Sequence, residues 1–375
     1  MGSMVVLVNP QTGKEFRISS KSARSFFGAN GINKKFLCLP CYSEIQLRED
    51  PTSLQFYIKK YKRKKKVSGT CVIRMGGLGD LILLSSGLQA LKKRMKGEPL
   101  TFATLKTHQS FMHQIDSIDQ CITVDELGGY EFDKVIDLRF AVEPPQLGAI
   151  CKGTWDSYTT EDRSDVFDKL LGVYPAPKRF SLPVDDKATK KMAGLVPETF
   201  ILINACMIAA ARSIVSKYIL PLCGLITKKL HIPVVLVGVS QTWNMGLKAI
   251  SMPNVINLID KTNISEMISL CHLSDLVVTP DTSTVHIAGA MGKRAIGLFG
   301  NINPRTRISY YPNVRALYPH GKLSCIPCHD LHPCMADPNK SPKCMELLTP
   351  DVIFNAIEQE YSGVKQCLIS QHLWS

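Results

Sequence analysis

Runs of apolar, largely β-branched residues alternate with helix-forming segments through most of the chain after residue 66. The clearest example is residues 276–299, where two apolar runs flank a short helical pattern. Strands of a parallel sheet are buried on both faces and read as continuous apolar runs, so this order predicts a βαβ unit. Pro280 ends the first strand, and the three residues that follow it carry side chains that can cap the helix: Asp281, Thr282 and Ser283.

The same alternation predicts two successive series of strands and helices, each of the Rossmann-like type. The first series has strands at residues 72–74, 100–104, 120–124 and 134–138 and helices at residues 80–96, 110–115 and 164–171. The second has strands at residues 199–204, 233–238, 255–259, 276–279 and 295–299 and helices at residues 215–230, 265–273, 284–291 and 349–361. The connection between the two series is marked by Pro175, Pro177 and Pro183.

The first 66 residues follow a different pattern. A strand at residues 5–8, a turn and a return strand at residues 14–18 predict a hairpin. Cys38 and Cys41 form a C-x-x-C turn, which is half of a zinc ribbon, so this part reads as a ribbon that has lost two ligands or as a plain turn. Residues 54–66 combine three aromatic residues with seven Lys and Arg. That stretch fits an amphipathic helix, a contact with nucleic acid or an anionic membrane, or a charged linker.

Length and composition are those of a globular protein. A chain of 375 residues, 45% hydrophobic and 21% charged, is expected to form two domains of ordinary size. No apolar run approaches the roughly 18 residues of a membrane span. Ten Lys and four Arg against three Glu and one Asp give residues 1–66 a net charge of +10, out of +13 for the whole chain. A basic module of this kind predicts a polyanionic partner, with a solubilising surface as the simpler alternative.

Cysteine usage indicates thiols rather than disulfides. Thirteen cysteines in a chain without a secretory signal pattern are expected to be reduced thiols or metal ligands. Four of them have a spacing compatible with a structural zinc site of four thiolates: Cys325, Cys328, Cys334 and Cys344. The alternative is four thiols that are free or partly joined in disulfides.

The helix after the strand at residues 276–279 is a candidate site for a phosphate group. A strand that feeds a helix presents unpaired backbone N–H groups and the positive end of the helix dipole. Thr284 lies at this helix start, and His286 lies one turn further in, where its ring could face the same ligand. An ordinary strand-to-helix corner with a satisfied cap is the alternative.

Two motifs resemble those of a known family. The pattern D-T-S-x-x-H-x-A-x-A-x-G-K at residues 281–293, followed by an apolar strand and F-G, resembles the nucleotide-sugar loop of family 9 glycosyltransferases, the ADP-heptose:lipopolysaccharide heptosyltransferases. The pattern R-x-G-x-L-G-D-x-x-L at residues 74–83 resembles the first strand, glycine turn and first helix of the same family. The resemblance covers residues 70–361 and does not extend to the first 66.

This resemblance implies an α/β protein with the GT-B fold, in which two Rossmann-like domains face each other across a cleft, plus a small basic N-terminal module. The expected domains are the basic module at residues 1–66, an acceptor domain at 67–185, a donor domain at 186–361 and a tail at 362–375. The implied activity is inverting transfer of a sugar from a nucleotide-diphosphate sugar to a hydroxyl group. No cofactor is expected for catalysis, because backbone N–H groups and an arginine can ease departure of the diphosphate.

The resemblance also implies roles for individual residues. Asp80 is expected to be the general base that takes the proton of the acceptor hydroxyl, whereas the ordinary interpretation makes it the N-cap of its helix. Arg212 is expected to contact the donor phosphates, although Ile214 and Val215 replace a tryptophan-proline pair of the family and Ser283 replaces its usual glycine. Further donor-side residues are expected to be Gly238, Asp281, Thr282, Ser283, Thr284 and His286. The acceptor side is expected to include Gly76, Gly77, Gly79, Asp137, Arg139 and Arg163, with surface solvation as the alternative for the last two.

The main hypothesis for the acceptor is a hydroxymethylated base in viral DNA, because of the basic module. Phosphate contacts are then expected from Lys59, Lys60, Lys62, Arg63, Lys64, Lys65 and Lys66. The alternative is a lipopolysaccharide core or another surface glycan, and a more remote one is a sugar-nucleotide-binding protein without turnover. The expected location is the cytoplasm, that of a virus-infected bacterial cell under the first hypothesis and with peripheral membrane association under the second.

Overall fold

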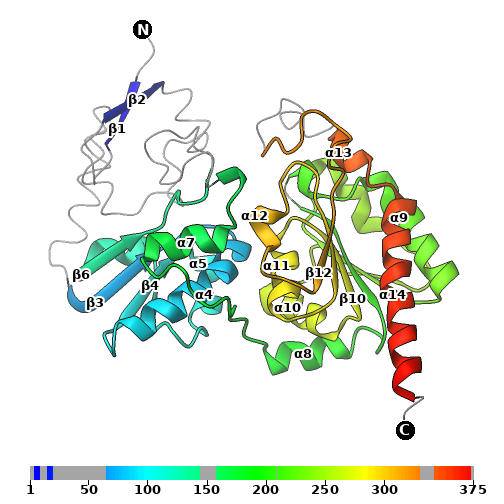
Figure 1. Cartoon of the computed structure of the whole chain (residues 1–375), viewed down its shortest axis with the longest axis horizontal. Coiled ribbons are helices and arrows are strands. Elements are labelled where there is room, and N and C mark those ends of the chain that lie inside the picture. The colour runs from blue at the N-terminus through cyan, green and yellow to red at the C-terminus, as the bar shows by residue number, and fades with distance from the viewer. Residues whose placement is uncertain are drawn as a thin grey trace. The chain divides into compact units, whose positions relative to one another are not determined.

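The computed structural model of the chain describes residues 4–8, 15–19, 65–143, 158–207, 209–329 and 342–372 (Figure 1). The chain divides into two compact units, Met1–Ser181 and Leu182–Ser375. Each of the two units contains its own parallel sheet. The predicted class, an α/β protein with two Rossmann-like halves, is therefore confirmed.

Near the N-terminus, β1 (Met4–Val8) and β2 (Glu15–Ser19) pair in antiparallel fashion, which confirms the predicted hairpin strands. The turn between them lies outside the described residues, as do Cys38, Cys41 and residues 59–64. The zinc-ribbon and nucleic-acid interpretations of these residues therefore stay predictions.

The sheet of the first unit has four strands among the described residues: β3 (Lys65–Ile73), β4 (Leu100–Thr104), β5 (Gln120–Thr123) and β6 (Tyr130–Asp137). They are parallel and lie in the order β5-β4-β3-β6. Strands β4 and β5 are added in turn on one side of β3, and β6 then pairs with the opposite side of β3. The loops after β3 and β6 therefore diverge at the carboxyl ends of the strands, and such a topological switch point is where open parallel sheets bind ligands.

Strand β3 begins well before the strand predicted at residues 72–74. Its first residues are Lys65 and Lys66, which are exposed and pair with Tyr130 and Glu131 of β6. The charge pattern did not predict that the strand starts here. Strand pairing uses backbone groups, so it tolerates lysines wherever their side chains reach water.

The helices of the first unit are α4 (Leu78–Arg94), α5 (Lys106–Met112) and α7 (Arg163–Leu171), with a short 3₁₀ turn η1 (Val124–Gly129). Helices α4 and α7 pack against each other. A Cβ atom at Gly87 of α4 would lie 2.5 Å from Oδ1 of Asp168, so the missing side chain lets α7 approach. The helices predicted at residues 80–96 and 164–171 are confirmed to within two residues at each end, whereas α5 starts four residues before the helix predicted at 110–115.

Lys178 ties the segment after α7 back onto that helix. Its Nζ lies 2.7 Å from Oδ1 of Asp165 and 2.6 Å from Oδ2 of Asp168. Burial raises the pKa of the Asp168 carboxyl, while the hydrogen bond from Lys178 acts in the opposite direction. A buried carboxylate is costly unless a cation accompanies it, so Lys178 stabilises the contact between α7 and the following segment.

The sheet of the second unit has six strands among the described residues: β7 (Ile201–Cys206), β8 (Val234–Gly238), β9 (Val255–Asn257), β10 (Leu276–Pro280), β11 (Ala295–Leu298) and β12 (Val314–Leu317). All are parallel, in the order β12-β11-β10-β7-β8-β9. This is the strand order of a dinucleotide-binding Rossmann domain, with the switch point between β7 and β10.

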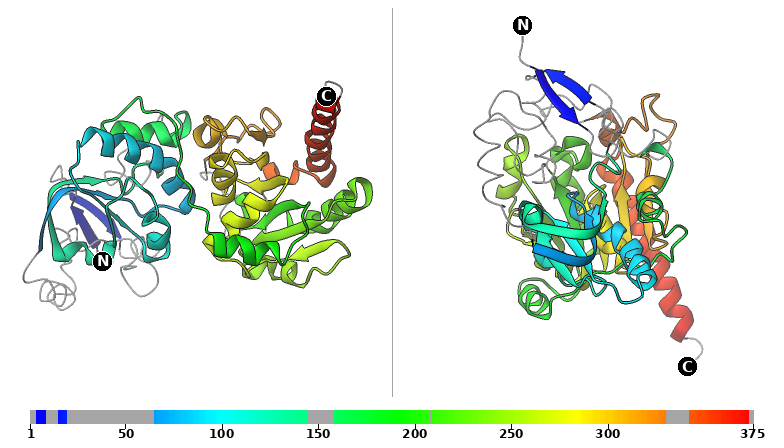
Figure 2. Two further views of the ribbon diagram at one scale, coloured as in Figure 1. Left: turned by 90° about the horizontal axis from the view of Figure 1, so that it is seen from below. Right: turned by 90° about the vertical axis from the view of Figure 1, so that its left-hand side faces the viewer.

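Helices cover both faces of this sheet (Figure 1). The longer ones are α8 (Asp186–Ala193), α9 (Ser216–Leu225), α10 (Ile264–Leu273), α11 (Ser283–Ala290) and α14 (Pro350–His372). Helix α9 continues as the π-helical turn η4 (Ile226–Leu230), and the shorter helices are η3 (Ala210–Arg212), η5 (Thr242–Ala249), α12 (Arg305–Ile308) and α13 (Lys343–Glu346). Helix α14 runs well beyond the helix predicted at residues 349–361, into the predicted tail (Figure 2).

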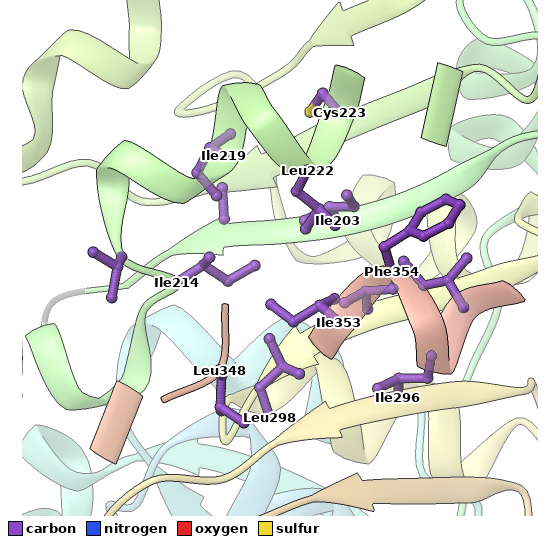
Figure 3. Packing of buried hydrophobic residues seen from close by; sticks show 14 of the residues in the cluster. Ile203, Ile214, Ile219, Leu222, Cys223, Ile296, Leu298, Leu348, Ile353 and Phe354 are labelled. Carbon is purple, nitrogen blue, oxygen red and sulfur yellow. The ribbon is translucent and has the colours of Figure 1, made fainter. Parts of the chain in front are cut away.

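One apolar cluster joins α9 and α14 to the sheet (Figure 3). Ile203 of β7 lies under α9, and Ile296 and Leu298 of β11 lie under α14, within the same buried cluster. The cluster also includes Cys223, and burial raises the pKa of its thiol to about 12, so it packs as a small hydrophobic residue. No disulfide joins any two of the eight cysteines whose side chains the structure describes.

We expect that Lys178→Met lowers the free energy of unfolding by about 3–5 kcal/mol, because it removes the cation that binds two carboxylates of α7, one of them fully buried. The matched control is Lys169→Met. Lys169 pairs with Glu161 at the surface, with 46% of its side chain exposed, and such pairs contribute less than about 1 kcal/mol. Urea unfolding of both variants measures the difference, and equal losses would contradict the role given to Lys178.

Candidate functional site

Asp80 lies in the first turn of α4 and is held by two arginines. Its Oδ2 accepts a hydrogen bond from Nη2 of Arg74 at 2.8 Å, and its Oδ1 accepts one from Nη1 of Arg163 at 2.6 Å. The Asp80 side chain is 12% exposed, so the carboxylate can still be approached from solvent. Gly77, not Asp80, is the N-cap of α4, and no side chain caps this helix. The ordinary N-cap interpretation of Asp80 is therefore wrong, because the carboxylate binds guanidinium groups instead of the helix backbone.

Arg74 is the centre of this cluster, and its side chain is 1% exposed. Its fork also binds Glu143, with Nη2 to Oε1 at 2.8 Å and Nη1 to Oε2 at 3.1 Å, and Nη1 donates to the carbonyl of Leu138 at 2.9 Å. Burial alone would lower the pKa of Arg74, but the charges of Glu143 and Asp80 raise it above its ordinary value. A permanently charged guanidinium is thus shared by two carboxylates.

These residues lie at the switch point of the first sheet. Arg74 directly follows β3, and Leu138 and Glu143 follow β6. Asp137 and Arg139, which the sequence placed on the acceptor side, lie at the same end of β6 and pair with each other, with Nε of Arg139 2.9 Å from Oδ1 of Asp137. Arg163, also predicted on this side, binds Asp80 instead of standing as a separate surface cation.

The glycine turn before α4 makes room for this ion cluster. A Cβ atom at Gly76 would lie 2.6 Å from Nε of Arg74 and 2.7 Å from Oδ2 of Asp80. At Gly77 an added Cβ would meet no atom of the described residues within 4 Å. Gly79 is buried within α4. Of the three predicted glycines, Gly76 is therefore the one whose missing side chain permits the contact between Arg74 and Asp80.

In the second unit, Asp281 follows β10 and Arg212 follows β7, on the two sides of the switch point. Nε of Arg212 donates a hydrogen bond to the backbone carbonyl of Asp281 and lies 3.6 Å from its Oδ2. Nε of Arg307, on α12, lies 3.7 Å from the same oxygen. The carboxylate is thus buried beside two arginines. Arg307 is buried as well, whereas the side chain of Arg212 is 38% exposed and is the one that a ligand can reach.

The start of α11 is organised by hydroxyl groups. Thr282 is its N-cap and accepts a hydrogen bond from the backbone N–H of Thr284, as the sequence predicted. Asn204, near the end of β7, donates from Nδ2 to Oγ1 of Thr282 at 3.2 Å and to Oγ1 of Thr284 at 2.7 Å. This buried amide therefore fixes the helix start to the neighbouring strand across the switch point.

The other predicted donor-side residues have different surroundings. His286 is buried, and its ring contacts Tyr311 edge-on at a centroid distance of 5.9 Å. Gly238 ends β8 with a φ of 142°, and a Cβ atom there would lie 2.5 Å from the carbonyl oxygen of Cys206. Close packing of β8 against β7 thus accounts for this glycine. Ser283 is the first residue of α11 and is half-buried.

The predicted metal site is only partly covered by the described residues, because Cys334 lies outside them. Within the described part of the chain, no group of three or more His, Cys, Asp or Glu side chains is arranged to hold a metal ion. Cys344 is buried, while Cys325 and Cys328 are half-buried. The four-thiolate zinc site therefore stays a prediction. The same described part contains no helix that is long and apolar enough to cross a membrane.

Comparison with known proteins agrees with the predicted fold. Residues 234–334 match the model of the family described as Glycosyltransferase family 9 (heptosyltransferase). No curated protein matches the chain. Among solved structures, a family 9 glycosyltransferase from Veillonella parvula DSM 2008 has a TM-score of 0.61 and 15% identity, and the alignment covers 79% of this chain and 96% of that one. The ADP-heptose lps heptosyltransferase II of E. coli has a TM-score of 0.58 and 14% identity, with coverages of 77% and 97%.

A third similar structure is TibC from enterotoxigenic E. coli H10407, an iron-containing dodecameric glycosyltransferase. Its TM-score is 0.58 at 15% identity, and the alignment covers 80% of this chain and 77% of that one. Fold and comparisons together define the chain as a glycosyltransferase of the GT-B class. Within that class it is heptosyltransferase-like, and the resemblance to family 9 that the two motifs predicted is confirmed.

Sequence reasoning missed four residues of the two clusters: Arg74, Glu143, Arg307 and Asn204. Arg74 was visible as the first residue of the motif at residues 74–83 but had no assigned role, and Arg307 lies shortly after the F-G pair that follows the second motif. Glu143 and Asn204 carry no comparable signal. Their contacts depend on which strands become neighbours in the sheet.

We expect that Gly76→Ala lowers the free energy of unfolding by roughly 1–3 kcal/mol, because the new methyl group pushes Arg74 and Asp80 apart. Gly77→Ala is the control, since its added methyl group enters open space and its φ of −66° suits alanine. Thermal unfolding of the two variants measures the difference. Equal melting temperatures would show that the Arg74–Asp80 contact does not need the glycine.

Proposed function

We propose that this chain transfers a sugar, with inversion, from an ADP-heptose-like nucleotide-diphosphate sugar to a hydroxyl group of a lipopolysaccharide core or another surface glycan. The single observation that carries the proposal is the position of Asp80. Its carboxylate lies at a ligand-binding switch point, is partly exposed, and occupies the place of the aspartate in the family's first motif.

The chemistry of transfer requires a base at this position. A sugar hydroxyl is a weak nucleophile until a carboxylate takes its proton during attack on the anomeric carbon. In one in-line displacement the new C–O bond forms as the bond to the nucleoside diphosphate breaks, and the configuration inverts. Two guanidinium groups at hydrogen-bond distance favour the carboxylate anion of Asp80, which is the form that accepts a proton.

The second unit supplies the chemistry for the donor. The N-terminus of α11 offers backbone N–H groups to a diphosphate, and Arg212 adds an accessible cation beside it. Both features would stabilise the charge that develops on the departing nucleoside diphosphate, so the proposal needs no metal at this step. Ile214 and Val215, in the place of the family's tryptophan-proline pair, leave the preferred sugar and nucleotide to be measured.

For the acceptor, the comparisons favour the surface-glycan alternative over the DNA hypothesis. One similar structure is named as a lipopolysaccharide enzyme, and the comparisons supply no support for a DNA acceptor. The exposed Lys65 and Lys66 would suit the phosphates of a lipopolysaccharide core as well as those of DNA. A protein that binds a sugar nucleotide without turnover would not need the ordered carboxylate of Asp80.

The proposed activity is tested with a panel of ADP-, UDP- and GDP-linked sugars, offered with truncated lipopolysaccharide or with hydroxymethylated duplex DNA. Mass spectrometry of both acceptors detects the product, and we expect transfer to lipopolysaccharide. Asp80→Asn should lower the rate by roughly 10²-fold or more, because the general base is lost, while Asp116→Asn removes an exposed carboxylate of the same unit and serves as the control. Product on DNA alone would overturn the acceptor, and a fully active Asp80→Asn variant would overturn the mechanism.

We further expect Arg212→Ala to weaken binding of ADP roughly tenfold or more, because a charged hydrogen bond to phosphate is lost. Arg315→Ala is the matched control, since Arg315 is similarly exposed and lies on β12, paired with Glu360. Calorimetric titration with ADP compares the two variants. Equal affinities would mean that the diphosphate does not bind at the start of α11.

A further inference from the structure

A second carboxylate shares the arginine that binds Asp80, and it belongs to a segment distant in sequence. Glu143 follows β6 and takes both arms of the Arg74 fork, at 2.8 and 3.1 Å. The Nη2 atom of Arg74 lies at the same distance, 2.8 Å, from Oε1 of Glu143 and from Oδ2 of Asp80. One guanidinium nitrogen therefore donates hydrogen bonds to two carboxylates.

This sharing of Arg74 matters for a general base. Two cations that have no competing anion stabilise the charged form of the carboxylate they bind. Such a carboxylate takes up a proton poorly. Arg163 and Arg74 both bind Asp80, so without a competing anion Asp80 would be a weak base. Glu143 counteracts one of these cations and places a like charge near Asp80, and both effects make the Asp80 carboxylate readier to accept a proton.

We infer that Glu143 is a positioning residue that sets the base strength of Asp80 by sharing Arg74 with it. The inference rests on the proposed role of Asp80 as general base. Glu143 is not a catalytic residue in this account, because it acts on the acceptor only through Arg74 and Asp80. It also orients the Arg74 fork, since its two oxygens meet the two Nη atoms that bind Asp80 and the carbonyl of Leu138.

Among the described residues, charged groups on the neighbouring elements α7 and β6 have partners of their own. On α7, Asp165 and Asp168 share Lys178, and Asp162 caps the helix by accepting from the backbone N–H of Ser164. At the end of β6, Asp137 binds Arg139. Arg74 and Arg163 bind Asp80 directly, and Glu143 is an anion joined to Asp80 through Arg74.

The test is the pH dependence of kcat/KM, whose acidic limb reports the base of the free enzyme. Glu143→Gln keeps the size of the side chain and removes its charge. We expect the acidic limb to move to lower pH by roughly one unit and the plateau rate to fall several-fold, because Asp80 becomes a weaker base. Glu143→Asp keeps the charge, so its limb should stay near that of the wild type even if the shorter side chain lowers the rate.

Glu131→Gln is the matched control, because it removes an exposed carboxylate at the other end of β6. Its pH profile should equal that of the wild type. An unmoved limb in Glu143→Gln, or an equal shift in Glu131→Gln, would overturn the inference and leave the proposed function intact. Failure of the proposed function has a different signature, namely an Asp80→Asn variant that keeps both its rate and the acidic limb.

Discussion

A single buried guanidinium group determines how the candidate site of the first unit is assembled. Arg74 comes from the end of β3, and its fork reaches Asp80 on α4 and both Glu143 and the carbonyl of Leu138 after β6. Arg163 of α7 binds the other oxygen of Asp80, so four segments of the chain meet in this cluster. A buried cation of this kind is tolerable only while its anions stay in place, so the cluster forms as a unit or not at all.

Both switch points pair an arginine with a carboxylate, but the two units differ in which of the two groups is exposed. At the switch point of the first sheet the arginine is buried and the carboxylate of Asp80 is the group within reach of solvent. At the switch point of the second sheet the carboxylate of Asp281 is buried and Arg212 is the accessible group. Under the proposed function, the first arrangement would present a proton acceptor to the acceptor hydroxyl and the second would present a cation to the donor diphosphate.

Much of the fold could be predicted because apolar runs mark buried parallel strands regardless of what surrounds them. The strands around Asp281, the cap at Thr282 and the helix after Asp162 are all local signals, and each was read correctly. The ion clusters were not predicted, because Glu143 and Asp80 become neighbours only when β6 returns to the side of β3. Local sequence also allows Asp80 to be a helix cap. The arginines that bind its carboxylate come from other elements, so the sequence near Asp80 does not reveal them.

Because β3 starts at Lys65, the two exposed lysines at its amino end lie a full strand length away from the candidate base beyond its carboxyl end. Lys65 and Ile73 are the two ends of one strand, and at about 3.3 Å per residue they are separated by roughly 26 Å. Lys65 and Lys66 therefore stand at the amino ends of the strands, whereas Asp80 lies at the carboxyl ends. A polyanion held by these two lysines could not place its own anchored phosphate at Asp80. It would need an arm long enough to run the length of the strand, as a branched and extended glycan has, before one of its hydroxyl groups arrived there.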